Sequence, residues 1–300
     1  MASASEELAQ RLHTVHHLEQ VMGTVVTIDI YVGTGGSDLE VFSRLEQALD
    51  VLHDADHVFS TWKSDSSISH LRRGEITLDQ APAVVGDVLE ACRVARALSE
   101  GWFDPWAMRG GVDPTGFVKG WAAQRALQVL AAPGIPGAIV NAAGDIASFG
   151  GPGEASTFRF GIVDPFSHER LACIVGLVGA LATSGTYEQG LHLVDPHSGQ
   201  PITRVASASV CGPDLGLADA LATGLAVAGD PGLAVIEGIE GYEAMIIGLD
   251  GTWQWTRRFP FADGPALPPV QETSRPASLR DKRQSLNRST PTLSPWAPPR

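Results

Sequence analysis

Two residues with oxygen-bearing side chains lie one helical turn apart in an otherwise apolar segment. In Ala218-Asp219-Ala-Leu-Ala-Thr223, the aspartate and the threonine are four positions apart, so in a helix they share one face. A carboxylate and a hydroxyl together suit a hard cation such as Mg²⁺. The spacing also fits an ordinary early-helix charge followed by a small core residue, and by itself it leaves both interpretations open.

A second segment has residues that could bind an anion. Asp113-Pro-Thr-Gly116-Phe-Val-Lys119-Gly120 combines a glycine-containing turn with the start of a predicted helix. Free backbone N–H groups and the helix dipole favour a phosphate at such a position, and Lys119 adds a positive charge. The alternative is a capped helix with a solvated lysine.

Polar turns follow several of the apolar segments. His192 lies on a predicted strand that ends in the turn Asp195-Pro196-His-Ser-Gly199. A single histidine on a strand is usually a structural residue, so the pattern around it is no more specific than a turn. Three further polar turns have the sequences GWFDP (101–105), NAAGDI (141–146) and TSGTY (183–187).

The elements that must position these residues indicate an α+β fold. Apolar residues at helical spacing predict helices over 39–57, 84–99, 117–130 and 215–228, with shorter ones at 6–18, 67–72 and near Leu233. Alternating β-branched residues predict strands over 22–32 and 242–249, and short strands such as LHLV (191–194) between them. The apolar run 171–183 predicts one core strand. Helices followed by a β-rich middle exclude regular βαβ alternation.

Net charge and the lack of long apolar segments argue against nucleic-acid binding and membrane insertion. The 21 Lys and Arg against 34 Asp and Glu give a net charge of −13, which argues against binding nucleic acid. No segment resembles a signal peptide or a membrane-spanning helix, so we expect no membrane insertion.

Three widely spaced cysteines favour a reducing compartment, and we expect a cytoplasmic protein. Residues 264–300, with six basic and two acidic side chains, predict a disordered basic tail.

Taken together and in order, these segments resemble the ApbE-type FAD:protein FMN transferases. The resemblance covers about residues 20–250 and depends on MGT (22–24), FSTWKSDSSISHL (59–71), GWFDP, VDPTGFVKGWAA (112–123), NAAGDI, HLVDPHSGQPI (192–202) and ADALATGL (218–225). It implies a two-lobed α+β fold with a β-rich central part, flanking helices and a disordered C-terminal tail. The corresponding boundaries are 1–20 for an N-terminal helical extension, 21–263 for the flavin transferase domain and 264–300 for the tail.

The resemblance also assigns roles to individual residues. It implies a Mg²⁺ site formed by the Gly116 carbonyl, Asp219 and Thr223. Its cofactor-binding residues correspond to Met22, Trp62, Trp102, Phe103, Asp104, Asp113, Lys119 and His192. We expect three departures from the family pattern. Asp113 follows Asp104 by only nine positions, Ala143 replaces a glycine in NAAGD, and the lipobox of the family's secreted members is absent. If a positive φ is needed at Ala143, we expect the turn to shift.

The implied reaction is the Mg²⁺-dependent transfer of FMN from FAD to a Thr or Ser hydroxyl of an acceptor flavoprotein, with release of AMP. Its catalytic residues are His192, as the general base, and Asp219. An imidazole with its ordinary pKa of ~6.5 can accept a hydroxyl proton at neutral pH. A Mg²⁺-dependent FAD pyrophosphatase and a non-catalytic FAD-binding carrier are the alternatives. The Asp-x-x-Ser-Gly-Ala-Thr type of acceptor motif is absent from this chain, so we expect the acceptor to be another protein.

Overall fold

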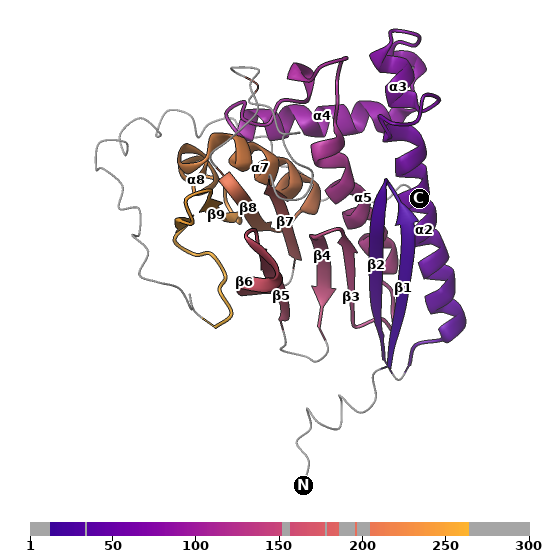
Figure 1. Cartoon of the computed structure of the whole chain (residues 1–300). Helices are drawn as coiled ribbons and strands as arrows, with labels where there is room; N and C mark the ends of the chain where they lie inside the picture. Colours follow the sequence, from indigo (N-terminus) through magenta and orange to yellow (C-terminus); the bar gives the residue numbers. More distant parts are fainter. Residues whose placement is uncertain are drawn as a thin grey trace. The chain divides into compact units, whose positions relative to one another are not determined.

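An eight-stranded antiparallel sheet is the centre of the fold (Figure 1). The computed structural model describes residues 13–33, 35–151, 157–177, 179–185, 196 and 205–263, all within the unit Met1–Val270. The strands follow the order β1 (His13–Val21), β2 (Thr24–Val32), β3 (Gly137–Ala142), β4 (Asp145–Gly150), β7 (Gly179–Gly185), β8 (Val205–Gly212), β9 (Glu243–Gly248) and β10 (Trp253–Trp255). The predicted tail and residues 1–12 lie outside the described residues.

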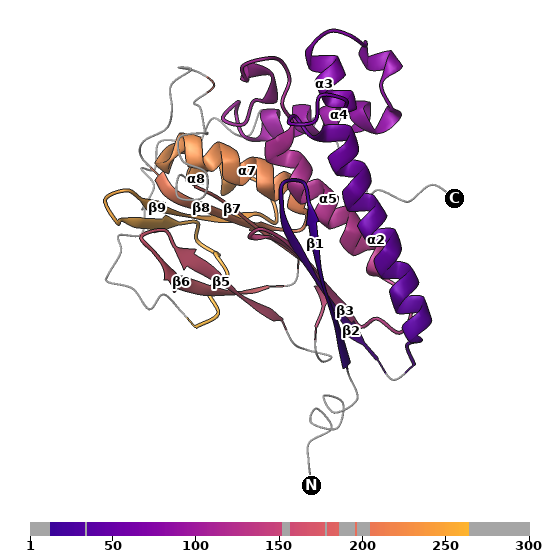
Figure 2. The ribbon, with the colours of Figure 1, turned by 45° about the vertical axis from the view of Figure 1, so that its right-hand side comes forward.

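Helices cover one face of this sheet, and a two-stranded sheet covers the other (Figure 2). The helices are α2 (Asp38–Phe59), α3 (Ser67–Arg72), α4 (Ala83–Leu98), α5 (Thr115–Leu130), α7 (Leu215–Ala228) and α8 (Asp230–Ile236), with 3₁₀ turns η1 (Leu78–Gln80) and η2 (Pro105–Ala107). The second sheet pairs β5 (Phe158–Asp164) with β6 (Ser167–Leu177). The described residues thus form three layers.

Period-two alternation along the central strands produces two separate cores. In β9, Ala244 and Ile246 face the helices, whereas Met245 and Ile247 face the second sheet. A strand that is buried on both faces reads as a continuous apolar run, which explains why the β-rich middle of the sequence shows little polar alternation. The predicted α+β class is confirmed, and the predicted helices over 39–57, 67–72, 84–99, 117–130 and 215–228 correspond to α2, α3, α4, α5 and α7.

Two predicted elements are wrong. Residues 13–18 belong to strand β1 and not to a helix over 6–18, because β1 pairs with β2 along its whole length, from His13 opposite Val32 to Val21 opposite Thr24. The predicted strand over 171–183 is two strands in different sheets, since β6 ends at Leu177 and β7 begins at Gly179. Gly179 has a φ of 128°, which favours glycine and allows the chain to change sheets. The predicted strand 191–194 lies outside the described residues.

Within the part of the chain that the structure describes, no helix has both the length and the apolar character needed to cross a bilayer.

Candidate metal and anion site

Helices α5 and α7 cross closely at Gly120, and this contact orients Asp219. The Gly120 N–H donates to Asp219 Oδ2 at 3.0 Å, and only 4% of Asp219 is exposed. A Cβ added at Gly120 would overlap the Leu215 carbonyl oxygen and lie 2.9 Å from the Asp219 Cβ. Only glycine fits at this crossing, so the carboxylate of α7 can reach the backbone of α5.

The backbone at Gly116 departs from the regular helical pattern at the same place. The N–H four residues later, at Gly120, donates to the Asp219 carboxylate. Gly116 has a ψ of 15°, which turns its peptide plane out of the helical orientation. A Cβ at Gly116 would lie 3.1 Å from Thr223 Oγ1. The structure therefore brings the three predicted metal-binding residues together.

Lys119 lies next to a buried carboxylate. Its Nζ atom is 2.8 Å from Asp145 Oδ2, and Asp145 is only 1% exposed, whereas 29% of the lysine side chain is exposed. The other carboxylate oxygen of Asp145 accepts the Thr183 N–H at 3.1 Å. The ammonium group is thus held against Asp145, in a side chain that remains partly exposed.

The end of β7 supplies two hydroxyl groups beside these residues. Thr183 Oγ1 is 2.9 Å from Ser209 Oγ on the neighbouring strand β8. Ser184 Oγ is 3.3 Å from Thr223 Oγ1. Hydrogen bonds of this kind restrict the rotation of a hydroxyl, so Ser184 helps to orient the oxygen of Thr223.

The loop before α5 contributes Trp102, Phe103 and Asp104. Phe103 is buried, and its ring lies 3.4 Å from the position of a Cβ at Gly116, so it packs beneath the start of α5. Asp104 lies 2.7 Å from Arg96 Nε and accepts the Trp106 N–H at 2.9 Å, which caps η2. Trp102 is half-buried.

Asp113 fixes the start of α5. Its Oδ1 atom accepts the Thr115 N–H at 3.1 Å and the Thr115 hydroxyl at 2.7 Å. Its Oδ2 atom lies 2.8 Å from Arg72 Nη1 on α3. The carboxylate of Asp113 therefore links α3 to the turn that contains Gly116.

The two residues predicted to contact the flavin ring lie in turns. Met22 and Gly23 connect β1 to β2, and both have positive φ angles, 55° and 70°. Trp62 follows the end of α2 and is 96% exposed, so no described residue covers its ring. An exposed indole ring of this kind is free to stack on a flat ligand.

His192 lies outside the described residues, and its role as general base stays a prediction.

Sequence reasoning did not select Asp145 and Ser184, which the structure places beside Lys119 and Thr223. The signal for Asp145 was a carboxylate directly after the Ala143-Gly144 turn of NAAGDI.

Ala143 adopts a φ of 51° in this turn, so the turn has not shifted as we expected, and the alanine takes the left-handed conformation. The Gly144 N–H donates to Asn141 Oδ1 at 2.8 Å and closes the turn.

The chemistry of the donor set suits a hard cation. No three His, Cys, Asp or Glu side chains within the described ranges are grouped to bind a metal ion, so the set has one carboxylate and neutral oxygens. Burial, together with the nearby Asp219 carboxylate, raises the pKa of the Cys92 thiol to about 12. Cys92 is therefore a neutral thiol at physiological pH and a poor metal ligand.

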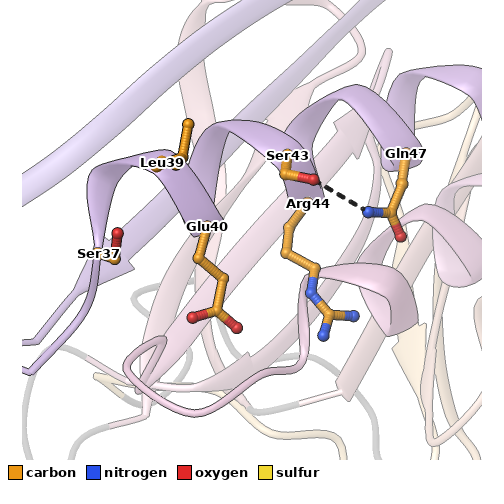
Figure 3. Close-up of a pocket in the computed structure, with 6 residues that line it drawn as sticks. All are labelled: Ser37, Leu39, Glu40, Ser43, Arg44 and Gln47. Carbon is orange, nitrogen blue, oxygen red and sulfur yellow. Dashed lines mark hydrogen bonds between the residues drawn. The ribbon is translucent and has the colours of Figure 1, made fainter.

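A hollow on α2 lies apart from these residues (Figure 3). It measures about 460 Å³ and is lined by residues of the first turns of this helix: Ser37, Leu39, Glu40, Ser43, Arg44 and Gln47. Gln47 Nε2 donates to Ser43 Oγ, one turn earlier on the same helix, at 3.3 Å. It contains none of the predicted site residues, so we place the candidate site at the α5–α7 crossing.

Comparison with known proteins gives the family. A model of the ApbE family matches residues 22–109 and 107–246, which make up most of the chain, and the chain belongs to this family. The ApbE protein of Thermotoga maritima has the same fold, with a TM-score of 0.69 at 20% identity over 82% of this chain and 97% of that one. For the flavin transferase ApbE of Vibrio cholerae the TM-score is 0.70 at 23% identity, with the same coverage.

Curated relatives carry the name FAD:protein FMN transferase. The Rhodobacter capsulatus protein is 36% identical over 128 residues, which is 40% of this chain and 24% of the relative. The Vibrio cholerae protein is 33% identical over 151 residues, which is 46% of this chain and 45% of the relative. The chain thus spans less than half of the length of these curated relatives.

Proposed function

We propose that this protein transfers FMN from FAD to a Thr or Ser hydroxyl of an acceptor protein and releases AMP. The observation that carries the proposal is the convergence of Gly116, Asp219 and Thr223 at the crossing of α7 with α5, the helix that also carries Lys119. Membership of the ApbE family and the names of the curated relatives support the same reaction.

The residues at the α5–α7 crossing fit Mg²⁺. One carboxylate and two neutral oxygens leave further positions for water and for substrate phosphate oxygens, which is the usual arrangement around Mg²⁺ in phosphoryl-transfer sites. When bound, the ion would neutralise charge on the phosphate oxygens. Asp219, Thr223 and the Gly116 carbonyl would bind it, and the Gly120 N–H would keep one oxygen of Asp219 in a fixed orientation.

The chain's own residues have separate tasks in the transfer. Lys119 binds the pyrophosphate of FAD, and the exposed ring of Trp62 stacks on its flavin. The acceptor hydroxyl attacks the flavin-side phosphorus, the bond to the bridging oxygen breaks, and AMP leaves with that oxygen. The hydroxyl proton passes to a base, for which His192 is the candidate. Much of the rate enhancement comes from holding donor and acceptor in line.

The proposed reaction takes place in a reducing compartment. Cys92, Cys173 and Cys211 are all free, and unpaired cysteines are typical of such a compartment. This supports the predicted cytoplasmic location.

The experiment supplies FAD and Mg²⁺ with and without an acceptor protein that carries a threonine in the Asp-x-x-Ser-Gly-Ala-Thr context. We expect AMP release that depends on the acceptor, and mass spectrometry should find FMN linked to the acceptor threonine. Release of AMP and free FMN at the same rate without the acceptor would identify a pyrophosphatase instead. FAD binding with no AMP release under either condition would identify a carrier.

A further inference from the structure

We infer that Asp145 is a positioning residue that fixes the Lys119 ammonium and the end of β7 around the substrate phosphates. This inference rests on the proposed function, because it gives Lys119 a phosphate to bind. Asp145 itself is buried and acts through its neighbours.

The first observation is the pairing of a buried carboxylate with a partly exposed lysine. Asp145 is 1% exposed, and its Oδ2 atom makes no well-aligned hydrogen bond among the described residues. The Lys119 Nζ atom, 2.8 Å away, is therefore what offsets the cost of burying this charge. Because this pairing is needed to bury Asp145, the lysine has a reason to stay in one position even when no ligand is bound.

The second observation connects the same carboxylate to the proposed metal ligands. Its Oδ1 atom accepts the Thr183 N–H at 3.1 Å, and the next residue, Ser184, lies 3.3 Å from Thr223 Oγ1. Asp145 is thus linked to Lys119 through one oxygen and to the neighbour of Thr223 through the other. A single side chain sets the distance between the cation that binds phosphate and the helix that binds metal.

Preorganisation explains why this matters for binding FAD. A lysine side chain has four rotatable bonds, and ordering it on ligand binding costs free energy. The ion pair orders Lys119 beforehand, so the loss of the ion pair should weaken FAD binding more than it slows turnover. A purely structural role would lower stability without a selective effect on FAD.

The substitution Asp145→Asn removes the link to Lys119 and keeps the link to Thr183. An asparagine of the same size can still accept the Thr183 N–H, but it cannot form an ion pair with Lys119. We expect the KM for FAD to rise about tenfold with kcat within about twofold, and FAD affinity measured without Mg²⁺ by flavin fluorescence to fall by a similar factor. Ser148→Ala is the matched control, because it removes a buried hydroxyl on the same strand β4, bonded to Gly179 at the start of β7, and leaves Lys119 and Thr183 untouched. We expect it to leave the KM unchanged.

A double-mutant cycle tests whether Asp145 acts through Lys119. In a Lys119→Met background, the Asp145→Asn change should have no further effect on the KM for FAD. Effects on KM that multiply would overturn the inference, as would an unchanged KM in Asp145→Asn alone.

Lysine labelling tests the ion pair without any flavin. Trace acetylation with acetic anhydride should modify Lys119 several-fold faster in Asp145→Asn, because an ammonium that loses its carboxylate is more readily deprotonated. Lys63, paired with Asp56 at 2.7 Å, is the internal standard. Unchanged labelling of Lys119 would overturn the inference. Faster labelling in a protein whose wild type neither binds FAD nor releases AMP would instead show that the pairing is correct and the proposed function is wrong.

Discussion

Asp219 is the residue on which the proposed chemistry depends most directly. One of its oxygens accepts the Gly120 N–H, which sets the orientation of the carboxylate relative to the Gly116 carbonyl and Thr223. Because it is the charged member of an otherwise neutral donor set, its charge should matter more for metal binding than either neutral oxygen.

Asp219→Asn tests this charge directly. The amide oxygen can still accept the Gly120 N–H, so the fold should change little, while Mg²⁺-dependent AMP release should fall at least about 100-fold. Steady-state assays over a range of Mg²⁺ concentrations provide the measurement. Asp230→Asn, at an exposed position at the start of α8, is the control and should keep normal activity. Near-normal turnover in Asp219→Asn would place the metal elsewhere.

Thr223→Val and Thr223→Ser compare the hydroxyl with the methyl group of the same side chain. Valine removes the oxygen next to Ser184, so the Mg²⁺ concentration for half-maximal AMP release should rise about tenfold. Serine keeps the oxygen and should stay within about threefold of the wild type, with a small loss from the missing methyl group. An equal effect of both substitutions would show that Thr223 contributes packing and not a ligand.

At the scale of secondary-structure elements, the crossing of α5 and α7 is the feature that creates the site. Gly120 is the point of closest approach, where a Cβ has no room against the backbone of α7. Gly86 in α4 is the opposite case, because a Cβ there would meet no atom within 4 Å. Both glycines lie inside helices, so alanine has the same intrinsic helical advantage at each position.

Gly120→Ala and Gly86→Ala should therefore have opposite effects. We expect Gly86→Ala to stabilise the protein by about 0.5–1 kcal/mol through helix propensity. Gly120→Ala should destabilise it by about 1–3 kcal/mol because the helices must separate, and it should also weaken Mg²⁺ dependence by displacing Asp219. Urea unfolding gives both free energies of unfolding. A stabilising effect of Gly120→Ala would contradict the close crossing.

The β3–β4 hairpin provides a second prediction at this scale. Ala143 and Gly144 form its two-residue turn with φ angles of 51° and 95°, and two positive angles are typical of a type I′ turn. The left-handed conformation is unfavourable for alanine, so Ala143→Gly should stabilise the protein by about 0.5–1 kcal/mol after the entropy cost of glycine. The free energy of unfolding measures this. Destabilisation would show that the alanine methyl group makes compensating contacts.

For the whole molecule, residues 256–263 complete the second core. Phe259 is buried, and its ring and that of Phe261 have centroids 4.9 Å apart. The Gly176 N–H donates to the Pro260 carbonyl at 3.0 Å, which attaches this segment to β6. The last described residue, Asp263, forms an ion pair with Arg159 on β5.

Two truncations test this organisation. A chain that ends after Asp263 should keep its Tm within about 2 °C, since the composition of residues 264–300 predicts no packed structure. A chain that ends after Trp255 loses the Phe259 side chain from the core and should melt at least about 5 °C lower. Equal melting temperatures for the two truncations would show that the segment 256–263 is not needed to cover the second sheet.

Features that depend on neighbouring residues could be predicted from the sequence. The periodicity of apolar residues predicted α2, α4, α5 and α7, because the side chains that create this pattern lie within one or two turns of each other. Asp219 and Thr223 were recognised as one face of a helix for the same reason, and the ordered set of motifs indicated the ApbE family.

Features that depend on distant residues were decided by the tertiary structure alone. Residues 13–18 form a strand because β2, a distant segment, provides its hydrogen-bonding partners, which the predicted helix over 6–18 did not take into account. The ion pair between Lys119 and Asp145 forms because α5 packs on the strand that Asp145 begins, 26 positions later in the chain. Local sequence encodes the conformational preferences of adjacent residues, whereas burial and long-range pairing arise only when separate elements pack together.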